Sequence, residues 1–438
     1  MNNFKSFLNE KGFLFFQIGI FLILSAPNLA AIFILFSLFC THFKNNTHKF
    51  INNKWIMPFF FSGLIAIISA FNSSFRDFQI EGWDKYLSWI GLGNWIPFFY
   101  LIWRAQIYLY KAEMRRKVSN MLLAGTVPFI FSGFGQLWFD WHGPLIFMNG
   151  LIIWFQRSIN IDNGQGITAM FNNQNYAACW LIIIWPFCLN KFLITKGWDF
   201  KKLLFIIFTS LIVFSVYLTK SRSGVAGTIS SSLFLIDKSY IAIILVIVSS
   251  YFLATLSFIP EYFQNIFRKL FPENLIKAFE FSRITNIFNE PRIYIYQNTL
   301  PIIMERPLLG WGAASFPILF NERYIDFKRE PTHPHNLILE MGNSYGLIFA
   351  LIISLSIIII LYLSFKMIFI RKKRIINNKI NIDILSDKAW WSSFFALFLS
   401  QMYDIQYFDF RISISFWILL TGLICILESK FYANLVDE

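Results

Sequence analysis

Long apolar runs separated by short polar stretches repeat along the whole chain. A run of about 20 apolar residues can cross a hydrocarbon core about 30 Å thick as a helix. The pattern predicts helices at about 13–26, 28–41, 55–71, 88–103, 119–138, 172–190, 203–219, 223–236, 239–258, 337–365, 389–402 and 412–427. The predicted fold class is therefore all-α: a polytopic integral membrane helical bundle of about 12 transmembrane helices.

One connection, residues 259–336, is far longer than the others and carries nine Lys or Arg against eight Asp or Glu. Within it, residues 273–288 and 293–304 alternate apolar and polar positions at near-helical spacing, which is typical of helices lying at a membrane interface. We expect transmembrane helices in 1–258, one large periplasmic loop with short interfacial helices in 259–336, and the last transmembrane helices in 337–438.

Charge along the connections predicts which side faces the cytoplasm. Twelve crossings put both termini on one side, and most basic connections fall on that side, at 44–54, 104–117, 191–202 and 371–374. The positive-inside rule makes this side cytoplasmic, so we predict a bacterial inner membrane protein with both termini in the cytoplasm. A single kinked helix through Pro27 would place most basic loops outside, and the charge pattern therefore favours a hairpin of two helices.

Composition excludes several classes of protein. The 438 residues are 56% hydrophobic and 14% charged, whereas soluble domains average about 25% charged residues. The net charge of +13 is explained by the basic loops, so no nucleic acid partner is predicted. The motifs GxxxxGK[ST], HExxH and GxSxG are absent from the sequence, and we predict neither ATP nor any other cofactor. The four cysteines fall in apolar runs and suggest no metal cluster.

A very short turn between two predicted helices holds two cations and three hydroxyls, in residues 219–224. Arg222 could bind a phosphate through its guanidinium fork and Lys220 could add a point charge, which suits a diphosphate. Ser221 contributes a hydroxyl. The alternative is that both cations reach toward lipid headgroups, although a short outside turn is an unusual place for them.

Arg292, where the long loop returns to the membrane, is the second candidate ligand for an anion. Further along the loop, Gly310 and Gly312 allow positive φ angles and a close backbone turn. Arg306 lies beside a glutamate and a proline, and we interpret it as a surface or cap residue.

Two of the five histidines, His333 and His335, precede the tenth predicted helix. A neutral imidazole there could take a proton from an attacking hydroxyl, because its ordinary pKa is near 6.5. The alternative is a capping role, and no zinc-like ligand spacing accompanies the pair, so no metal is predicted. Asn336 follows directly. Glu340, one turn later, is expected to point into the bundle toward an arginine or backbone partner.

Four amides gather at the start of the sixth predicted helix, in residues 172–175. Amides of this kind can bind sugar hydroxyls, and they can equally cap a helix. Asn175 is therefore a candidate for positioning substrate.

Four stretches of the chain resemble the O-antigen ligase and polymerase superfamily of bacterial membrane glycosyltransferases. They are Phe171–Asn175, Ser221–Gly224, Arg292 with the later Arg306–Pro307 and Gly310–Gly312, and His335–Asn336 separated by nine residues from Gly346. The resemblance covers about 165–365. It departs from the ligase motif at Phe349, where the family has Gly, Thr or Tyr.

The resemblance implies an O-antigen ligase-like enzyme. Such an enzyme transfers a glycan from undecaprenyl diphosphate to a sugar hydroxyl, such as one of the lipid A core, at the periplasmic face, without a metal and with inversion. Family members carry essential residues at positions matching Arg222, Arg292 and His335, which the resemblance makes catalytic: the arginines on the diphosphate and the histidine on the acceptor hydroxyl. The residues predicted to bind or position substrate are Lys220, Ser221, Asn336, Asn175, Gly310, Gly312 and Glu340.

Other functions stay open at this point. A polysaccharide polymerase of the same superfamily uses the same donor and differs in its acceptor, and protein O-glycosylation is a third variant. A transporter for a small anion such as bicarbonate is possible, although midplane charges and inverted repeats are scarce. A membrane scaffold without catalytic activity is the remaining alternative. Membrane lipids are partners in every case.

Overall fold

The structure is a computed structural model. It describes residues 2–41, 53–75, 81–159, 165–195, 197–236, 291–324, 330–370 and 378–429, with short pieces between 246 and 276. These residues are mostly helical, which confirms the all-α prediction.

The helices of the first half of the chain are mostly 12–21 residues long. They are α1 (Asn2–Leu22), α2 (Pro27–Cys40), α3 (Met57–Phe75), α4 (Leu87–Gly91), the 3-10 turn η3 (Leu92–Asn94), α5 (Ile96–Leu109), α6 (Ala112–Gly125) and α7 (Val127–Trp138). A small hairpin of β1 (Leu145–Phe147) and β2 (Ile152–Trp154), joined by the 3-10 turn η4 (Met148–Gly150), follows them. The sequence did not predict this hairpin.

The second half of the chain contains long and short helices. Its elements are α8 (Gln174–Ile194), α9 (Phe200–Leu218), α10 (Arg222–Ser232), α12 (Glu261–Arg268), α14 (Pro291–Glu305), α15 (Phe316–Arg323), α16 (Leu337–Tyr345), α17 (Leu347–Phe365), the π-helical turn η6 (Lys366–Ile370), α18 (Asn378–Gln401) and α19 (Phe410–Glu428). Three of them, α12, α14 and α15, fall in the predicted periplasmic loop. The predicted helix at 239–258 and the predicted interfacial segment at 273–288 lie largely outside the described residues.

Six described stretches are long and apolar enough to cross a membrane. They are Met57–Ser74, Ala112–Trp138, Gln174–Ile194, Phe200–Leu218, Leu347–Ile370 and Phe410–Glu428. The chain is therefore a membrane protein with several transmembrane helices, and the number of twelve spans stays a prediction. Burial separates inner from outer helices: the most apolar window of α19 is 89% buried inside the protein, whereas that of α9 is 17% buried.

The first two helices pack against each other as a hairpin. Phe15 in α1 contacts Phe36 in α2 edge to face, with ring centroids 5.0 Å apart. Gly12 lies against Cys40, and Gly19 lies against Ala30 and Ile34, so the two helices run in opposite directions. The chain therefore turns back at Pro27, and it does not continue as one kinked helix.

Three helices predicted as continuous are broken, at 88–103, 119–138 and 337–365. Pro97 and Pro128 stand in the first turns of α5 and α7, and since proline lacks an N–H group, a new helix starts there. Gly346 separates α16 from α17 with a φ of 90°, and a Cβ at this position would lie 2.2 Å from the Leu308 carbonyl oxygen. A fourth prediction also needs correction, because α18 begins at Asn378 and not near 389.

Four cations predicted to lie in the basic loop 104–117 are inside helices, and two of them are buried. Arg104 belongs to α5 and Arg115 to α6, and each is 3% exposed. Arg115 donates two hydrogen bonds to the Asp387 carboxylate of α18, at 2.9 and 2.8 Å, and further bonds to the carbonyl oxygens of Leu109 and Tyr110. This buried ion pair joins α6 to α18, so it cannot be counted as loop charge.

Replacing Arg115 with alanine is expected to destabilise the protein by about 3–5 kcal/mol, because the Asp387 carboxylate would stay buried without its partner. The measurement is thermal unfolding of purified protein in detergent. Lys117→Ala is the matched control, since its pair with Glu113 on the same helix is half exposed and contributes little. An Arg115→Ala protein that unfolds at the parental temperature would contradict the assigned role of the pair.

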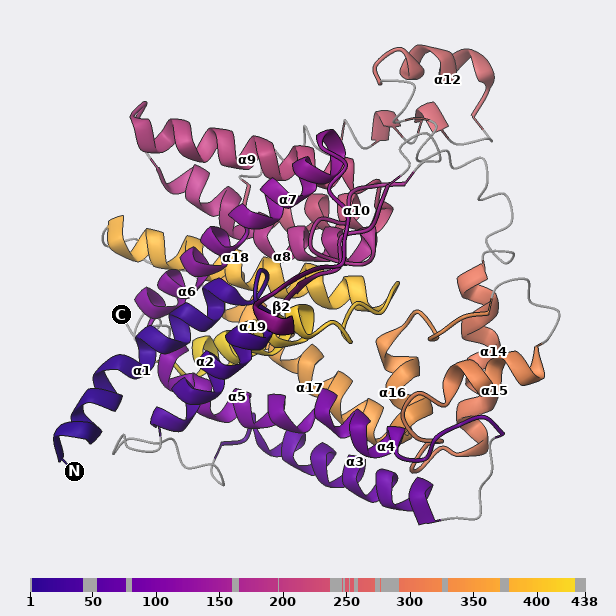
Figure 1. Cartoon of the computed structure of the whole chain (residues 1–438). Coiled ribbons are helices and arrows are strands. Elements are labelled where there is room, and N and C mark those ends of the chain that lie inside the picture. Colours follow the sequence, from indigo (N-terminus) through magenta and orange to yellow (C-terminus); the bar gives the residue numbers. More distant parts are fainter. Residues whose placement is uncertain are drawn as a thin grey trace.

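The start of α1 and the end of α19 lie toward the same side of the bundle (Figure 1). Gly12 at the start of the apolar part of α1 packs on Tyr108, and the Tyr110 hydroxyl donates to the carbonyl oxygen of Glu428 at the end of α19. α14, α15 and α16 lie at the opposite side (Figure 1). The helix ends on that opposite side are where the candidate residues collect.

Candidate functional site

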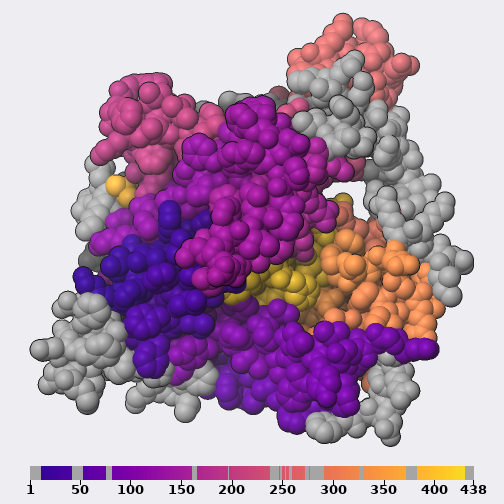
Figure 2. Space-filling view, viewed as in Figure 1, coloured from indigo at the N-terminus to yellow at the C-terminus, as the bar shows by residue number. Residues whose placement is uncertain are grey.

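Four separate parts of the chain meet at the end of the bundle away from the termini. They are the start of α8, the turn before α10, the residues before α16 and the connection between α18 and α19. In the space-filling view the surface is hollowed between the magenta region that contains β1 and β2 and the orange region of α14–α16 (Figure 2). The yellow C-terminal part of the chain is visible between these two regions (Figure 2).

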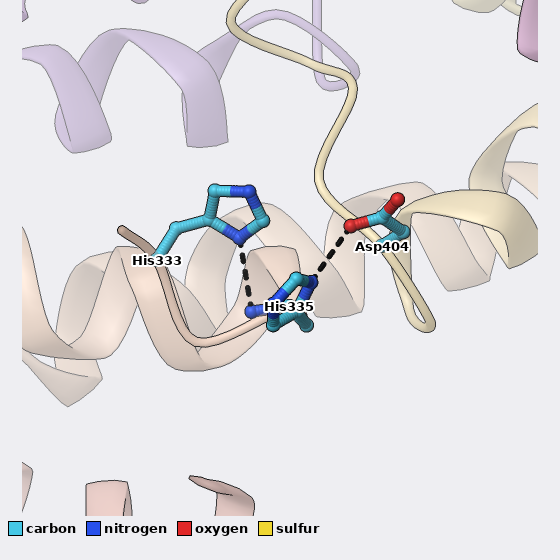
Figure 3. A group of neighbouring side chains, drawn as sticks. All are labelled: His333, His335 and Asp404. Atoms are coloured by element: carbon cyan, nitrogen blue, oxygen red, sulfur yellow. Dashed lines mark hydrogen bonds and ion pairs between the residues drawn. The ribbon is translucent and has the colours of Figure 1, made fainter. Parts of the chain in front are cut away.

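His335 is hydrogen-bonded to a carboxylate that comes from another part of the chain. Its Nδ1 lies 2.8 Å from Asp404 Oδ1 (Figure 3). A carboxylate only accepts hydrogen bonds, so Nδ1 carries the hydrogen and Nε2 of the neutral ring keeps its lone pair. The His335 side chain is 28% exposed and that of Asp404 is 9% exposed, so the imidazole is the member of the pair open to a substrate.

The backbone of His335 has a φ of 52°, which is unusual for a residue other than glycine. Two contacts accompany this conformation. The His335 N–H donates to Nδ1 of His333 at 3.2 Å (Figure 3), and the hydroxyl of Tyr296 in α14 lies 3.2 Å from the His335 carbonyl oxygen. Contacts to the N–H group and to the carbonyl oxygen of His335 therefore fix the backbone that carries the imidazole.

Neighbouring groups set the protonation of both partners of His335. Burial, together with the charges of His335 and Arg292, lowers the pKa of His333 to about 4, so at neutral pH its ring is uncharged and can accept the N–H of His335. Burial alone would raise the pKa of the Asp404 carboxyl, but the hydrogen bond and charge of His335, with the charge of Arg292, bring this pKa below its ordinary value. Asp404 is therefore ionised at neutral pH.

Asp404 also connects to the amide cluster and to the basic turn. Its second carboxylate oxygen accepts a hydrogen bond from Asn175 Nδ2 at 3.1 Å. The Oδ1 of Asn175 accepts one from the Ser221 hydroxyl at 3.0 Å. Ser221 is the N-cap of α10, since its Oγ also accepts the N–H of Gly224. A continuous path of polar contacts thus runs from Ser221 through Asn175 and Asp404 to His335.

Arg292 lies in the first turn of α14, beside this network. Its guanidinium is 3.7 Å from the ring centre of Tyr403, the residue before Asp404. One turn later in α14, the Tyr296 hydroxyl lies 3.2 Å from the Met402 carbonyl oxygen. The structure therefore places Arg292 close to the His335–Asp404 pair.

Arg222 and Lys220 flank Ser221 and are both exposed. Lys220 has a φ of 51°, so the turn is sharp at this residue. Among the residues that the structure describes, the Arg222 guanidinium has no hydrogen bond or ion pair, and it is available to an anionic ligand. The basic turn is joined to the His335 network through Ser221 and Asn175.

Asn336 and Glu340 have structural partners. The Asn336 side chain caps α16 by accepting the N–H groups of Ile338 and Leu339, and its Nδ2 donates to the Met402 carbonyl oxygen at 3.0 Å. Asn336 therefore ties α16 to the connection that holds Asp404. Glu340 is buried as predicted, but the partner that the structure gives it is the Ser344 hydroxyl of its own helix, at 2.8 Å, and not an arginine.

Gly310 and Gly312 lie about two turns from Asn336, at the other end of α16. Their φ angles are 69° and 108°, as the sequence predicted, and the N–H of Gly312 donates to the Ser344 carbonyl oxygen at 3.1 Å. A Cβ at Gly310 would lie 2.6 Å from the Asn343 carbonyl oxygen. The structure does not bring these glycines to His335, and they pack the segment between α14 and α15 onto α16.

His333, His335 and Asp404 also have the composition of a metal site. One ligand atom of each lies within 4.8 Å of the others. In the structure, however, Nδ1 of His335 and Nδ1 of His333 both take part in hydrogen bonds within the cluster (Figure 3). The expectation that no metal is used stays a prediction.

Sequence reasoning missed Asp404. In the sequence, residues 403–411 are a short connection between two apolar runs, with two aspartates and one arginine. The available signal was a carboxylate within three residues of the end of an apolar run, where an ionised group needs a partner. Its partner His335 is 69 positions away, and nothing local to Asp404 indicates the pairing.

Comparison with known proteins bears on the middle of the chain. Residues 206–354 match the sequence model of the O-antigen ligase family. This part of the chain is O-antigen ligase-like. The match begins in α9 and ends in α17, so it contains Arg222, Arg292 and His335 but neither Asn175 nor Asp404. A search of curated proteins found no match.

The O-antigen ligase-like region agrees with the resemblance seen in the motifs. It indicates a membrane glycosyltransferase-like enzyme of the ligase or polymerase kind, whose partners in general are a lipid-linked glycan and a glycan acceptor. Phe349, where the chain departs from the ligase motif, is fully buried and packs edge to face on Trp95 at 5.2 Å. The departure therefore lies in the core and does not touch His335.

Proposed function

We propose that the protein is an O-antigen ligase-type glycosyltransferase, which transfers a glycan from undecaprenyl diphosphate to a hydroxyl of the lipid A core. The observation that carries the proposal is the His335–Asp404 pair, joined by Asn175 to the turn that holds Arg222. A group suited to take a proton and cations suited to a diphosphate thus lie in one connected network.

The reaction is a single displacement at the anomeric carbon of the donor. The acceptor oxygen forms a bond to that carbon as the bond to the diphosphate oxygen breaks, which inverts the configuration. The proton of the acceptor hydroxyl goes to Nε2 of His335, and Asp404 stabilises the imidazolium that results. Arg222 and Arg292 stabilise the negative charge that develops on the leaving diphosphate.

We also propose that transfer needs no metal, because arginine side chains can supply the positive charge on the diphosphate and His335 Nδ1 is engaged by Asp404. Activity of purified protein is expected to be unchanged by a metal chelator. A loss of activity that added divalent cations restore would instead favour a metal bound by His333, His335 and Asp404.

The proposed topology is that of an inner membrane protein with about 12 spans, cytoplasmic termini and a periplasmic active face. Two features support this arrangement. The start of α10 and the start of α16, which border the network, lie at the end of the bundle away from the start of α1 (Figure 1). α14–α16 belong to or follow the proposed periplasmic loop and lie at the same end.

The surface glycolipids of a deletion strain test the proposed function. Loss of long chains from the lipid A core, with accumulation of long glycans on undecaprenyl diphosphate, is the expected result for a ligase. Single repeats that remain attached to the core would identify a polymerase instead. An unchanged glycolipid pattern would contradict glycan transfer, and saturable anion uptake by proteoliposomes would then support the transporter alternative.

A further inference from the structure

A polar pocket of about 270 Å³ lies beside the His335 network, at the start of α8. Its walls come from two segments, 157–159 and 165–175, that flank the N-terminal end of that helix. The side chains that line it include Arg157, Gln165, Thr168, Asn172 and Asn175. Only Asn175 among them belongs to the network described above.

The pocket is built on buried hydrogen bonds. Gln136 in α7 is 2% exposed, and its Oε1 accepts the N–H groups of Thr168 and Ala169 at 2.9 and 3.0 Å. Its Nε2 donates to the Thr168 hydroxyl at 2.9 Å and to the Arg157 carbonyl oxygen. One buried side chain therefore holds both walls together, which is the pre-organisation that a binding site requires.

A second contact ties the segment 165–175, which forms one wall of the pocket, to the connection that carries Asp404. Arg411, at the start of α19 and 4% exposed, donates to the Met170 carbonyl oxygen at 2.8 Å and lies 3.8 Å from the centre of the Phe171 ring. Its guanidinium is held in place by two hydrogen bonds to Asp409. The segment 404–411 thus carries Asp404 and also contacts the segment 165–175 that lines the pocket.

We infer that this pocket binds a sugar ring of one of the two substrates. Its side chains offer a guanidinium, amides and a hydroxyl, which can donate to and accept from sugar hydroxyls. Among the described residues, the Arg157 guanidinium has no hydrogen bond or ion pair. The volume lies just below the range of about 300–1,000 Å³ typical of larger ligands, which suits a single ring.

The placement of the pocket determines what the bound sugar would do. Asn175 lines the pocket and also donates to Asp404, the partner of His335. A ring held there lies next to the reacting groups, where either the first sugar of the donor or the accepting sugar must be held. The inference rests on the proposed function and names a part of its substrate site.

The test is steady-state transfer by purified Arg157→Ala and Asn172→Ala proteins, with donor and acceptor varied in turn. Each substitution removes hydrogen bonds to the ring, so KM is expected to rise about tenfold for one substrate while kcat changes little. A rise for the lipid-linked glycan places the donor sugar in the pocket, and a rise for the core acceptor places the accepting sugar there. Asn28→Ala, which alters an exposed amide in α2, is the matched control.

A binding measurement separates this inference from the proposed function. His335→Ala protein is titrated with lipid-linked glycan, with core acceptor and with undecaprenyl diphosphate that carries no glycan, with and without Arg157→Ala. Weaker binding of one of the two sugar-bearing ligands is expected, even if no transfer is ever detected. Unchanged affinities, or an equal loss for the carrier that lacks a glycan, would overturn the sugar pocket, whereas an inactive parental protein would overturn only the proposed function.

Discussion

Replacing His335 with alanine is expected to slow glycan transfer by about 10²–10⁴-fold, the usual contribution of a general base. The imidazole is the exposed member of the pair with Asp404, and its Nε2 is the atom available to the acceptor hydroxyl. The measurement is the transfer rate of purified protein with saturating donor and acceptor. Because the side chain acts in the chemical step, kcat should fall while the affinity for the donor stays near the parental value.

His142→Ala is the matched control for this substitution. His142 is an exposed histidine outside the network, with its Nδ1 near the carbonyl oxygen of Asp140, and its loss is expected to leave the rate unchanged. A His335→Ala protein that transfers glycan at the parental rate would remove the base from the mechanism.

Asp404 extends the same prediction, since it acts through His335. Asp404→Asn keeps the size of the side chain but removes the charge that orients and stabilises the imidazole. Its kcat should therefore lie between that of the parental protein and that of His335→Ala. In the double variant the two losses should not add, because the pair acts as a unit. Additive losses would mean that Asp404 contributes to stability alone, through its bond to Asn175.

Replacing Arg222 with alanine is the second large effect, with an expected loss of about 10²–10³-fold in rate. The guanidinium is exposed, has no partner among the described residues, and is carried by the turn whose Ser221 hydroxyl bonds to Asn175. Negative charge on the leaving diphosphate grows in the transition state. Because Arg222→Ala removes the group that stabilises this charge, the substitution should lower mainly kcat. Arg222→Lys should recover part of the rate, because it restores the charge without the two-pronged geometry.

Arg306→Ala is the control for the arginine substitution. The Arg306 guanidinium lies over the Trp311 ring at 4.3 Å, in the segment between α14 and α15 that packs on the C-terminal end of α16. The Arg306→Ala substitution is expected to leave kcat unchanged. Equal losses for Arg222→Ala and Arg306→Ala would indicate a general effect of positive charge on the membrane surface, and would contradict a specific diphosphate ligand.

Several helices could be predicted from hydropathy because their cause is local. The window of α17 is among the most apolar in the chain, and α8, α9 and α19 begin and end within a few residues of the predictions. Two of the predicted helices are wrong in length because proline breaks them. Pro97 and Pro128 interrupt apolar runs without changing their hydropathy, and a hydropathy pattern does not register a missing N–H group.

Burial of charge could not be predicted in the same way. Arg115 stands in a run of basic residues and resembles a loop cation in every local respect. Its actual environment depends on Asp387, which is 272 positions away. The cost of burying either charge alone is high, so only the packed helices make the position of both tolerable.

The sequence by itself determined the membrane class, the helical fold and the candidates Arg222, Arg292 and His335, since apolar length and short motifs are properties of neighbouring residues. Only the tertiary structure decided that Asp404 is the partner of His335, that Asn175 bridges Asp404 to Ser221, and that Gly310 and Gly312 serve packing. The physical reason is range. A hydrogen bond acts over about 3 Å in space, while Asn175 and Asp404 are 229 positions apart along the chain.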